Sequence, residues 1–321
     1  MRQATCVAGV NIALVKYWGK RDVAQNLPAV GSISLTIDTL RTVTTVHFDP
    51  ALAADTFTLD GVVRADPRVV HVLDGVRALR GLSAKARVES QNHVPTAAGL
   101  ASSASGTAAL ASAAWCAAGG ELSDALATPA FVDCVRRGSG SAPRSLWGGL
   151  VALQRDSGQV HQIAAHTHWP LAMVVVQIGA GPKAMSSRDG MQHTADTSPY
   201  YAPWVAAHPA DLTEAHAAIV GRDLARLGAV MERSTMRMHA CMLAADPPLR
   251  YLRGETLATI AAVEALRDAG VGAWYTMDAG PHVKVLCHPA DAPRIAHDLQ
   301  ADGRLIRIAH GGPGVRRVDP C

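Results

Sequence analysis

The chain has 321 residues, of which 49% are hydrophobic and 18% are charged, and its formal net charge is +3 at pH 7. This composition is typical of a globular protein with room for two cores, and it excludes a disordered chain. Because the positive excess is small and scattered, we do not expect a nucleic-acid-binding protein. Apolar runs are much shorter than the ~20 residues of a membrane span, and we expect no N-terminal leader. Six cysteines without a Cys-x-x-Cys pair favour a reducing compartment, so we expect a cytoplasmic protein.

The first half of the chain begins with strand-like segments that are rich in Val, Ile and Thr. We predict strands over residues 6–15, 32–37, 43–48 and 86–90. Asp60-Gly61 is a hairpin signal between short strands, and Asp66-Pro67 begins a helix that Gly81 ends. Further helices are expected over residues 104–118 and 131–137, with Ser123 as the cap of a short helix between them.

The second half restarts near residue 170 with an apolar strand over residues 171–178. Apolar side chains at helical spacing then predict one long helix with a single buried face, formed by Leu224, Leu227, Met231, Met238 and Met242. Later elements are a helix over 255–269, paired strands over 273–277 and 283–287, a helix over 291–299 and a strand over 305–308. This order predicts an α+β protein with two domains, at residues 1–170 and 171–321.

Residues 95–106 read Pro-Thr-Ala-Ala-Gly-Leu-Ala-Ser-Ser-Ala-Ser-Gly and lead into a helix of small residues. Free N–H groups at a helix start attract phosphate, and small side chains let it approach the backbone. The segment therefore indicates a nucleotide phosphate site, with Ser102 and Ser103 as candidate magnesium ligands. It matches neither the P-loop nor the dinucleotide-binding motif. The alternative is a small-residue helix that packs closely on a sheet.

Three other segments carry charged groups that suit an anionic substrate. Residues 11–22 place Lys16, Tyr17 and Lys20 at the end of an apolar strand, although a solvated basic edge is the ordinary explanation for any one lysine. Residues 138–145 form a small-residue loop with Arg144, whose guanidinium suits a carboxylate or a phosphate. Asp278 precedes a Gly-Pro turn; most turn aspartates are structural, but one that faces lysines can act as a base.

Together these segments resemble the GHMP kinase superfamily and, within it, the diphosphomevalonate decarboxylase family. The resemblance rests on residues 11–22, 95–106, 138–149, 186–191, 238–240 and 278–281. It implies an N-terminal domain like ribosomal protein S5 domain 2 and a ferredoxin-like C-terminal domain, with the active site between them. It also implies a homodimer that uses Mg-ATP to phosphorylate the 3-hydroxyl of mevalonate 5-diphosphate, and then loses phosphate and carbon dioxide to give isopentenyl diphosphate.

The resemblance also implies a role for each matching residue. Asp278 would orient or deprotonate the 3-hydroxyl, Lys16 would support the reacting centre, and Arg144 would hold the substrate carboxylate. The substrate-binding positions are Tyr17, Lys20, Ser139, Ser141, Arg144, Ser187 and Arg188. The ATP-binding positions are Pro95, Ala98, Gly99, Leu100, Ala101, Ser102, Ser103 and Ser105.

The chain departs from the family pattern at His93, His282, Pro143 and Gly31. The two histidines replace common asparagines, which leaves the hydrogen bonding around ATP open. The sequence also leaves open a mevalonate 5-phosphate decarboxylase, because the same basic loops would bind one phosphate or two. A mevalonate 3-kinase is a further alternative, although the retention of Lys16, Arg144 and Asp278 argues against a pure kinase. A nucleotide sensor without catalysis is disfavoured because Asp278 is present.

Overall fold

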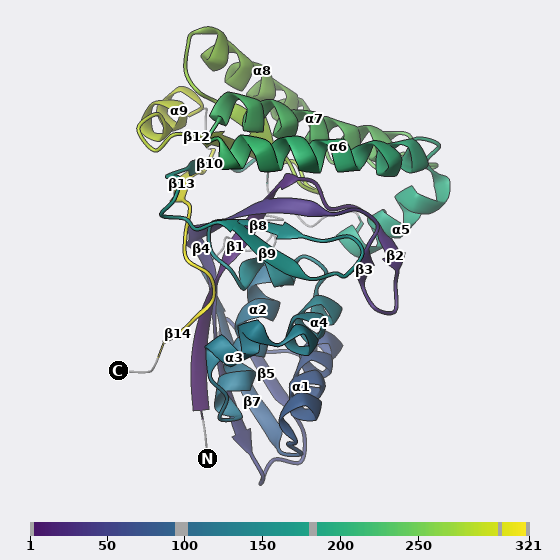
Figure 1. The fold of residues 1–321 in the computed structure, drawn as a ribbon, viewed down its shortest axis with the longest axis vertical. Coiled ribbons are helices and arrows are strands. Elements are labelled where there is room, and N and C mark those ends of the chain that lie inside the picture. The colour runs from purple at the N-terminus through teal and green to yellow at the C-terminus, as the bar shows by residue number, and fades with distance from the viewer. Residues whose placement is uncertain (1–2, 94–101, 180–184, 301–303, 319–321) are drawn as a thin grey trace.

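The computed structural model describes residues 3–93, 102–179, 185–300 and 304–318. An eight-stranded sheet lies below a layer of long helices in Figure 1. The strands of this sheet are β1 (Gln3–Val15), β4 (Ser32–Asp49), β5 (Thr56–Leu59), β6 (Val62–Val63), β7 (Lys85–Asn92), β8 (Leu150–Leu153), β9 (Val160–Ala164) and β14 (Arg316–Arg317). Its main order is β14-β1-β4-β7-β5-β6; β8 also pairs with β4, and β9 with β8.

The prediction of two separate strands over 32–37 and 43–48 is wrong, because β4 is one strand of 18 residues. Its first part pairs with β8 and its last part with β7, while β1 runs along nearly its whole length. A register shift between Gly9 and Asn11 lets β1 follow β4 past Asp38 and Thr39. These two exposed polar residues looked like a break in the sequence, but the partner strand keeps the backbone extended.

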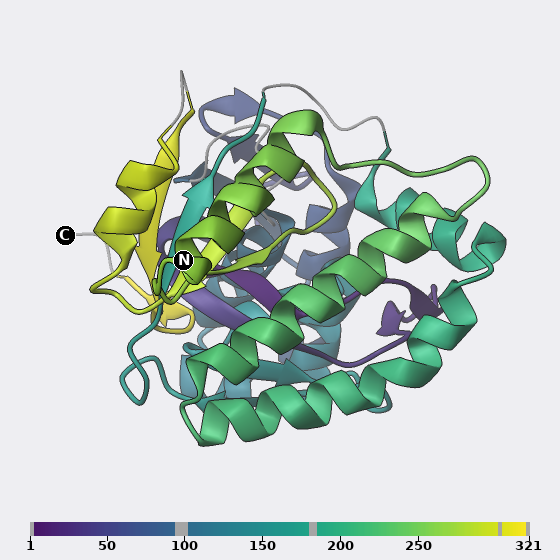
Figure 2. The ribbon, with the colours of Figure 1, turned by 90° about the horizontal axis from the view of Figure 1, so that it is seen from above.

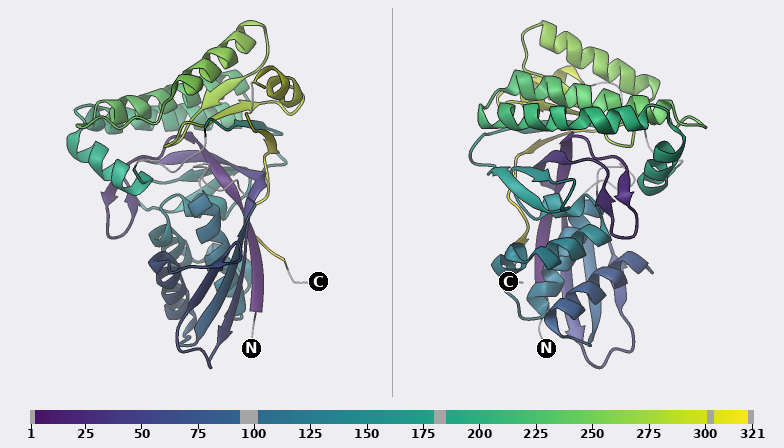
Figure 3. Two further views of the ribbon diagram at one scale, coloured as in Figure 1. Left: turned by 180° about the vertical axis from the view of Figure 1, so that it is seen from behind. Right: turned by 45° about the vertical axis from the view of Figure 1, so that its right-hand side comes forward.

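Four helices cover one face of this sheet (Figure 3, left). They are α1 (Pro67–Arg80), α2 (Ser102–Ala117), α3 (Leu122–Ala127) and α4 (Pro129–Gly138), and they are followed by the short 3-10 helix η1 (Ala142–Ser145). The Asp66 side chain accepts a hydrogen bond from the backbone N–H of Arg68, and Gly81 adopts a φ of 65°, so both predicted ends of α1 are confirmed. Ser123 lies inside α3 and Glu121 holds the N-cap position, so that predicted cap is wrong.

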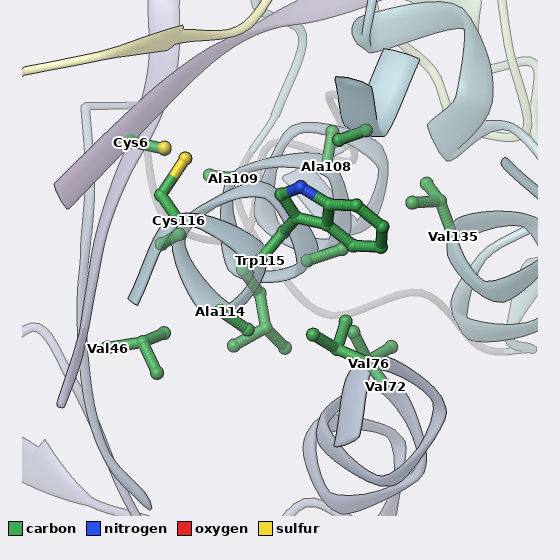
Figure 4. Close-up of a cluster of buried hydrophobic side chains, with 14 of the residues drawn as sticks. Cys6, Val46, Val72, Val76, Ala108, Ala109, Ala114, Trp115, Cys116 and Val135 are labelled. Atoms are coloured by element: carbon green, nitrogen blue, oxygen red, sulfur yellow. The ribbon is translucent and has the colours of Figure 1, made fainter. Parts of the chain in front are cut away.

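The small side chains of α2 let it pack closely against the sheet. Ala108, Ala109 and Ala114 are fully buried, and Trp115 fills the space beside them and meets Phe131 edge to face at 5.3 Å (Figure 4 shows the cluster around Trp115). The alternative reading of this helix, a small-residue element packed on a sheet, is therefore correct for its body. Close packing of the helix body is compatible with a phosphate site at the N-terminal end of α2.

The second half builds a four-stranded antiparallel sheet in the order β11-β12-β10-β13. Its strands are β10 (Ala172–Val176), β11 (Trp274–Thr276), β12 (Val283–Cys287) and β13 (Ile306–His310). Its helices are α5 (Ser187–Thr197), α6 (Tyr201–Val220), α7 (Leu224–Leu243), α8 (Gly254–Asp268) and α9 (Ala292–Asp298). Figures 1 and 2 show α6 and α7 running side by side across the molecule, perpendicular to its longest axis. Within the described ranges, no helix has the length and apolar character of a membrane span.

One buried cluster joins the two halves of the chain. Ile12 and Leu35 come from the large sheet, Met173 from the small one, and Leu227 and Met231 from α7. The predicted apolar face of α7 is confirmed, because all five of its residues are buried. Its first part packs where the two sheets meet, and Met238 and Met242 pack in a second cluster with Trp18 and Trp204. The short hairpin of β2 (Lys20–Asp22) and β3 (Leu27–Pro28) extends from the end of β1, beside α5. The end of β1, from which this hairpin extends, therefore lies between the two halves of the chain.

Candidate active site

A cavity of about 650 Å³ lies at the end of β1, between the two halves of the chain. Its walls come from β1, η1, the start of α2, the start of α5 and the turn after β11. Ten residues selected from the sequence line it: Lys16, Tyr17, Lys20, Ser103, Ser139, Ser141, Arg144, Ser187, Arg188 and Asp278. Folding therefore brings together side chains that are up to 262 positions apart in the chain.

Asp278 lies between two lysines at the base of this cavity. Lys16 Nζ donates to Asp278 Oδ1 at 2.8 Å, and Lys284 Nζ donates to Asp278 Oδ2 at 2.7 Å. Both lysine side chains are almost fully buried, whereas the Asp278 side chain is 24% exposed. The carboxylate is thus the part of this cluster that a ligand can reach.

The charges of the cluster determine its protonation. Burial by itself would raise the pKa of Asp278, but the two ammonium groups outweigh it and hold the pKa well below its usual range. Burial lowers the pKa of Lys16 to about 8, although Asp278 acts in the opposite direction. Asp278 is therefore ionised at neutral pH, and Lys16 holds its proton less tightly than an ordinary lysine.

Arg144 is buried beside this cluster and is held by three polar side chains. Its Nε and Nη2 donate to Asn11 Oδ1 at 3.2 and 3.0 Å, and its Nη1 donates to Ser32 Oγ at 2.6 Å. Ser34 Oγ also accepts from Nε, at 3.1 Å. Partners in the described part of the chain thus engage three of the five guanidinium N–H groups. One N–H on each terminal nitrogen remains for a planar anion such as a carboxylate.

The opposite wall of the cavity carries further cations at a helix N-terminus. Ser187 and Arg188 form the first turn of α5, where backbone N–H groups attract anions. Burial, and then the nearby charge of Arg188, lower the pKa of Lys20. The loop before η1 also approaches Tyr17 closely, because a Cβ at Gly140 would lie 2.2 Å from the Tyr17 hydroxyl. This wall therefore suits a phosphorylated end of a substrate.

The start of α2 is where the sequence predicts a nucleotide phosphate site. Ser102 and Ser103 begin the helix, and the exposed Ser103 lines the cavity. Ser105 does not join them, because its hydroxyl is buried 2.8 Å from Thr42 Oγ1. The other candidate ATP-binding positions lie outside the described residues: Pro95, Ala98, Gly99, Leu100 and Ala101.

The described lining of the cavity is strongly cationic. Five basic and two acidic side chains contribute to it: Lys16, Lys20, Arg68, Arg144, Arg188, Asp189 and Asp278. An excess of positive charge inside a concave site attracts multiply charged anions and strengthens their binding. The cavity is therefore suited to a small molecule with several phosphates and a carboxylate.

Comparison with known proteins identifies the family. Residues 8–164 match the model of the diphosphomevalonate decarboxylase-like N-terminal domain, and residues 172–302 match that of the mevalonate 5-diphosphate decarboxylase C-terminal domain. The chain belongs to the diphosphomevalonate decarboxylase family. It is 36% identical to the diphosphomevalonate decarboxylase of Candida albicans over 319 residues, which are 92% of this chain and 87% of the relative.

Solved structures of diphosphomevalonate decarboxylases share the fold. Mevalonate diphosphate decarboxylase from Staphylococcus aureus is 36% identical with a TM-score of 0.90, over 99% of this chain and 98% of that one. A structure described as MDDEF in complex with MVAPP, AMPPCP and magnesium is 38% identical with a TM-score of 0.90, over 99% of both chains. The prediction of an α+β, two-domain GHMP-kinase-like fold is confirmed.

Sequence reasoning missed several polar groups of this site. Arg68 in the first turn of α1 lines the cavity, and Asn11 orients Arg144. Lys284 holds the second oxygen of Asp278. A single lysine inside an apolar strand was the one local signal for Lys284, while Arg68 and Asn11 gave none. Only the packing of distant elements places them.

Three of the four departures from the family pattern are buried, and the fourth, His93, is exposed. His282 is buried, and its Nδ1 accepts a hydrogen bond from the backbone N–H of Ile178 at 2.9 Å. Pro143 occupies the first turn of η1, where its missing N–H costs nothing. At Gly31 a Cβ would lie 2.8 Å from Leu212, so this packing favours glycine.

Proposed function

We propose that this chain catalyses the ATP-dependent decarboxylation of mevalonate 5-diphosphate to isopentenyl diphosphate, in the mevalonate pathway of isoprenoid biosynthesis. The observation that carries the proposal is a partly exposed, ionised Asp278 that is paired with Lys16 and lies near Arg144, inside one cationic cavity. ATP enters as its magnesium complex. We propose that Ser102 and Ser103 meet its phosphates at the start of α2, where the helix dipole is favourable.

In the first step, the 3-hydroxyl attacks the γ-phosphorus of ATP. The bond from that phosphorus to the β,γ-bridging oxygen breaks, ADP leaves with the bonding electrons, and the hydroxyl proton passes to Asp278. The 3-hydroxyl donates a hydrogen bond to Asp278, which aligns the oxygen with the phosphorus. Such transfers pass through a loose transition state in which the nucleophile keeps its proton until late. A carboxylate of low basicity is therefore adequate, because the hydroxyl becomes strongly acidic once its oxygen bonds to phosphorus. Lys16 stabilises the negative charge on the transferred group.

In the second step, the C3–O bond breaks and the 3-phosphate leaves with the bonding electrons. Positive charge develops at C3, and the electrons of the C–C bond to the carboxylate form the new double bond as carbon dioxide departs. Arg144 holds the carboxylate in line with the breaking bond, and its own position is held by Asn11 and Ser32. Lys20 and Arg188 bind the diphosphate end, assisted by Tyr17, Ser139, Ser141 and Ser187.

Product analysis tests the proposal. Purified protein is incubated with Mg-ATP and mevalonate, its 5-phosphate or its 5-diphosphate, while carbon dioxide and ADP are measured. We expect both products, in equal amounts, with the diphosphate alone. ADP without carbon dioxide would indicate a 3-kinase, and turnover of the monophosphate would indicate the related decarboxylase.

Asp278→Asn tests the role of the carboxylate separately. It keeps the shape of the side chain but removes its charge, so kcat should fall by about 10²–10⁴-fold. Binding of the nucleotide, followed by fluorescence with a labelled ATP analogue, should change by less than about threefold. A variant that keeps near-normal turnover would remove Asp278 from the mechanism.

We further propose that the protein is a cytoplasmic homodimer. Within each chain, the boundary between the two domains lies between residues 170 and 171. Family resemblance supports the dimer, and the cysteine pattern supports the compartment. Light scattering in solution should give twice the 33.6 kDa of one chain. Cell fractionation tests the location, and limited proteolysis near residue 170 tests the boundary.

A further inference from the structure

Lys284 is a buried cation to which the mechanism above gives no task. It lies in β12, its side chain is 2% exposed, and its Nζ lies 2.7 Å from Asp278 Oδ2. It is not among the described residues that line the cavity, so it lies behind the carboxylate. A buried ammonium group is costly, and an apolar side chain of similar volume would pack here without that cost.

The groups around Asp278 come from four elements. Lys16 follows β1, Lys284 lies in β12, His239 lies in α7 and Arg144 lies in η1. Burial, and then the charge of Lys16, lower the pKa of His239 to about 3, so this imidazole is neutral. It also forms a hydrogen bond with the backbone of Asp278. Lys16, Asp278 and Lys284 therefore carry a net charge of +1, with Arg144 adding a second positive charge.

We infer that Lys284 is a positioning residue for the reaction. It anchors Oδ2 of Asp278, so that the carboxylate keeps one orientation toward the 3-hydroxyl, and it makes the Lys16–Asp278–Lys284 cluster cationic. This inference rests on the decarboxylation proposed above.

The charge matters because both steps place phosphate oxygens close to Asp278. With Lys16 alone, the pair would be neutral, and the carboxylate would repel the incoming phosphoryl group at short range. With Lys284 behind it, the cluster attracts that group and later the departing phosphate. Because each oxygen of Asp278 accepts a hydrogen bond from one lysine, rotation of the carboxylate would break both hydrogen bonds.

Lys284→Met tests the inference, because methionine keeps the volume and removes the charge. We expect kcat for decarboxylation to fall by roughly 10–100-fold, with KM for ATP nearly unchanged. The charge of Lys284 lowers the pKa of Lys16. We expect kcat/KM to decline at alkaline pH as Lys16 loses its proton. Removal of the Lys284 charge should therefore move this alkaline limb to higher pH by roughly one unit. A merely structural contribution of Lys284 would reduce the rate without moving that limb.

Lys284→Arg is the matched control, since it keeps the charge at the same position. It should retain the wild-type alkaline limb and recover most of the rate. Thermal unfolding of each variant confirms that it is folded before its rate is interpreted. Normal rate and pH profile in Lys284→Met would overturn the inference, as would a limb that moves equally in both variants. Absence of turnover by the wild-type protein would instead contradict the proposed function.

Discussion

Lys16 is a buried ammonium group that holds its proton weakly. Its pKa is lowered to about 8, chiefly by burial. If its charge stabilises the transferred phosphoryl group, activity is full below this pKa and declines as the pH rises through it. We expect kcat/KM to show an alkaline limb near pH 8. Substrate phosphates, whose last pKa is about 6, are already ionised in this range and do not produce the limb.

Lys16→Arg provides the control, because a guanidinium stays protonated throughout this range. It should be slower than the wild type and lack the limb near pH 8. A wild-type profile that stays flat from pH 7 to about 9.5 would contradict the assignment. If the alkaline limb persists in Lys16→Arg, then a group other than Lys16 produces it.

At the scale of elements, α7 packs between the apolar core and the strand that leads to Asp278. Gly228 on this helix faces the indole of Trp274 in β11, and a Cβ would lie 2.0 Å from that ring. Gly228→Ala should therefore lower the free energy of unfolding by about 1–3 kcal/mol, through overpacking. Because β11 leads directly to Asp278, the rate should fall as well. Urea unfolding and steady-state kinetics measure the two effects.

Gly254 at the start of α8 is the matched control for this substitution. A Cβ there meets no atom within 4 Å. Gly254→Ala should leave the rate unchanged and raise stability by about 0.4–1 kcal/mol, since alanine restricts the unfolded chain. Equal stability in the two variants would show that the space beside Trp274 accommodates a methyl group.

At the scale of the whole molecule, both halves of the chain contribute to the cavity. A ligand that bridges them binds only the folded protein, so it stabilises both halves together. At 100 times its dissociation constant, mevalonate 5-diphosphate should add about 2.7 kcal/mol. This corresponds to a rise in Tm on the order of 5 °C, measured by calorimetry. Mevalonate without the diphosphate, at the same concentration, should give a clearly smaller rise in Tm, because Lys20 and Arg188 would have no diphosphate to bind. An equal rise would contradict their role.

Local patterns allowed most elements to be predicted from the sequence. Asp66 and Gly81 set the ends of α1, and the spacing of Leu227 and Met231 predicted the buried face of α7. Such signals depend on neighbours within one or two helical turns. The helix α6 was missed because Pro209 and many alanines weaken its apolar period. The length of β4 was missed because pairing with β1 overrides local polarity.

The sequence by itself determined which chemical groups this protein has: the serine-rich helix start, the lysines, Arg144 and Asp278. Only the tertiary structure decided what each group faces. It placed Lys284 behind Asp278, Arg68 at the cavity and Ser105 against Thr42. The physical reason is distance along the chain. A charge acts over a few ångströms in space, and the packing of two sheets around α7, which no local pattern encodes, sets those distances.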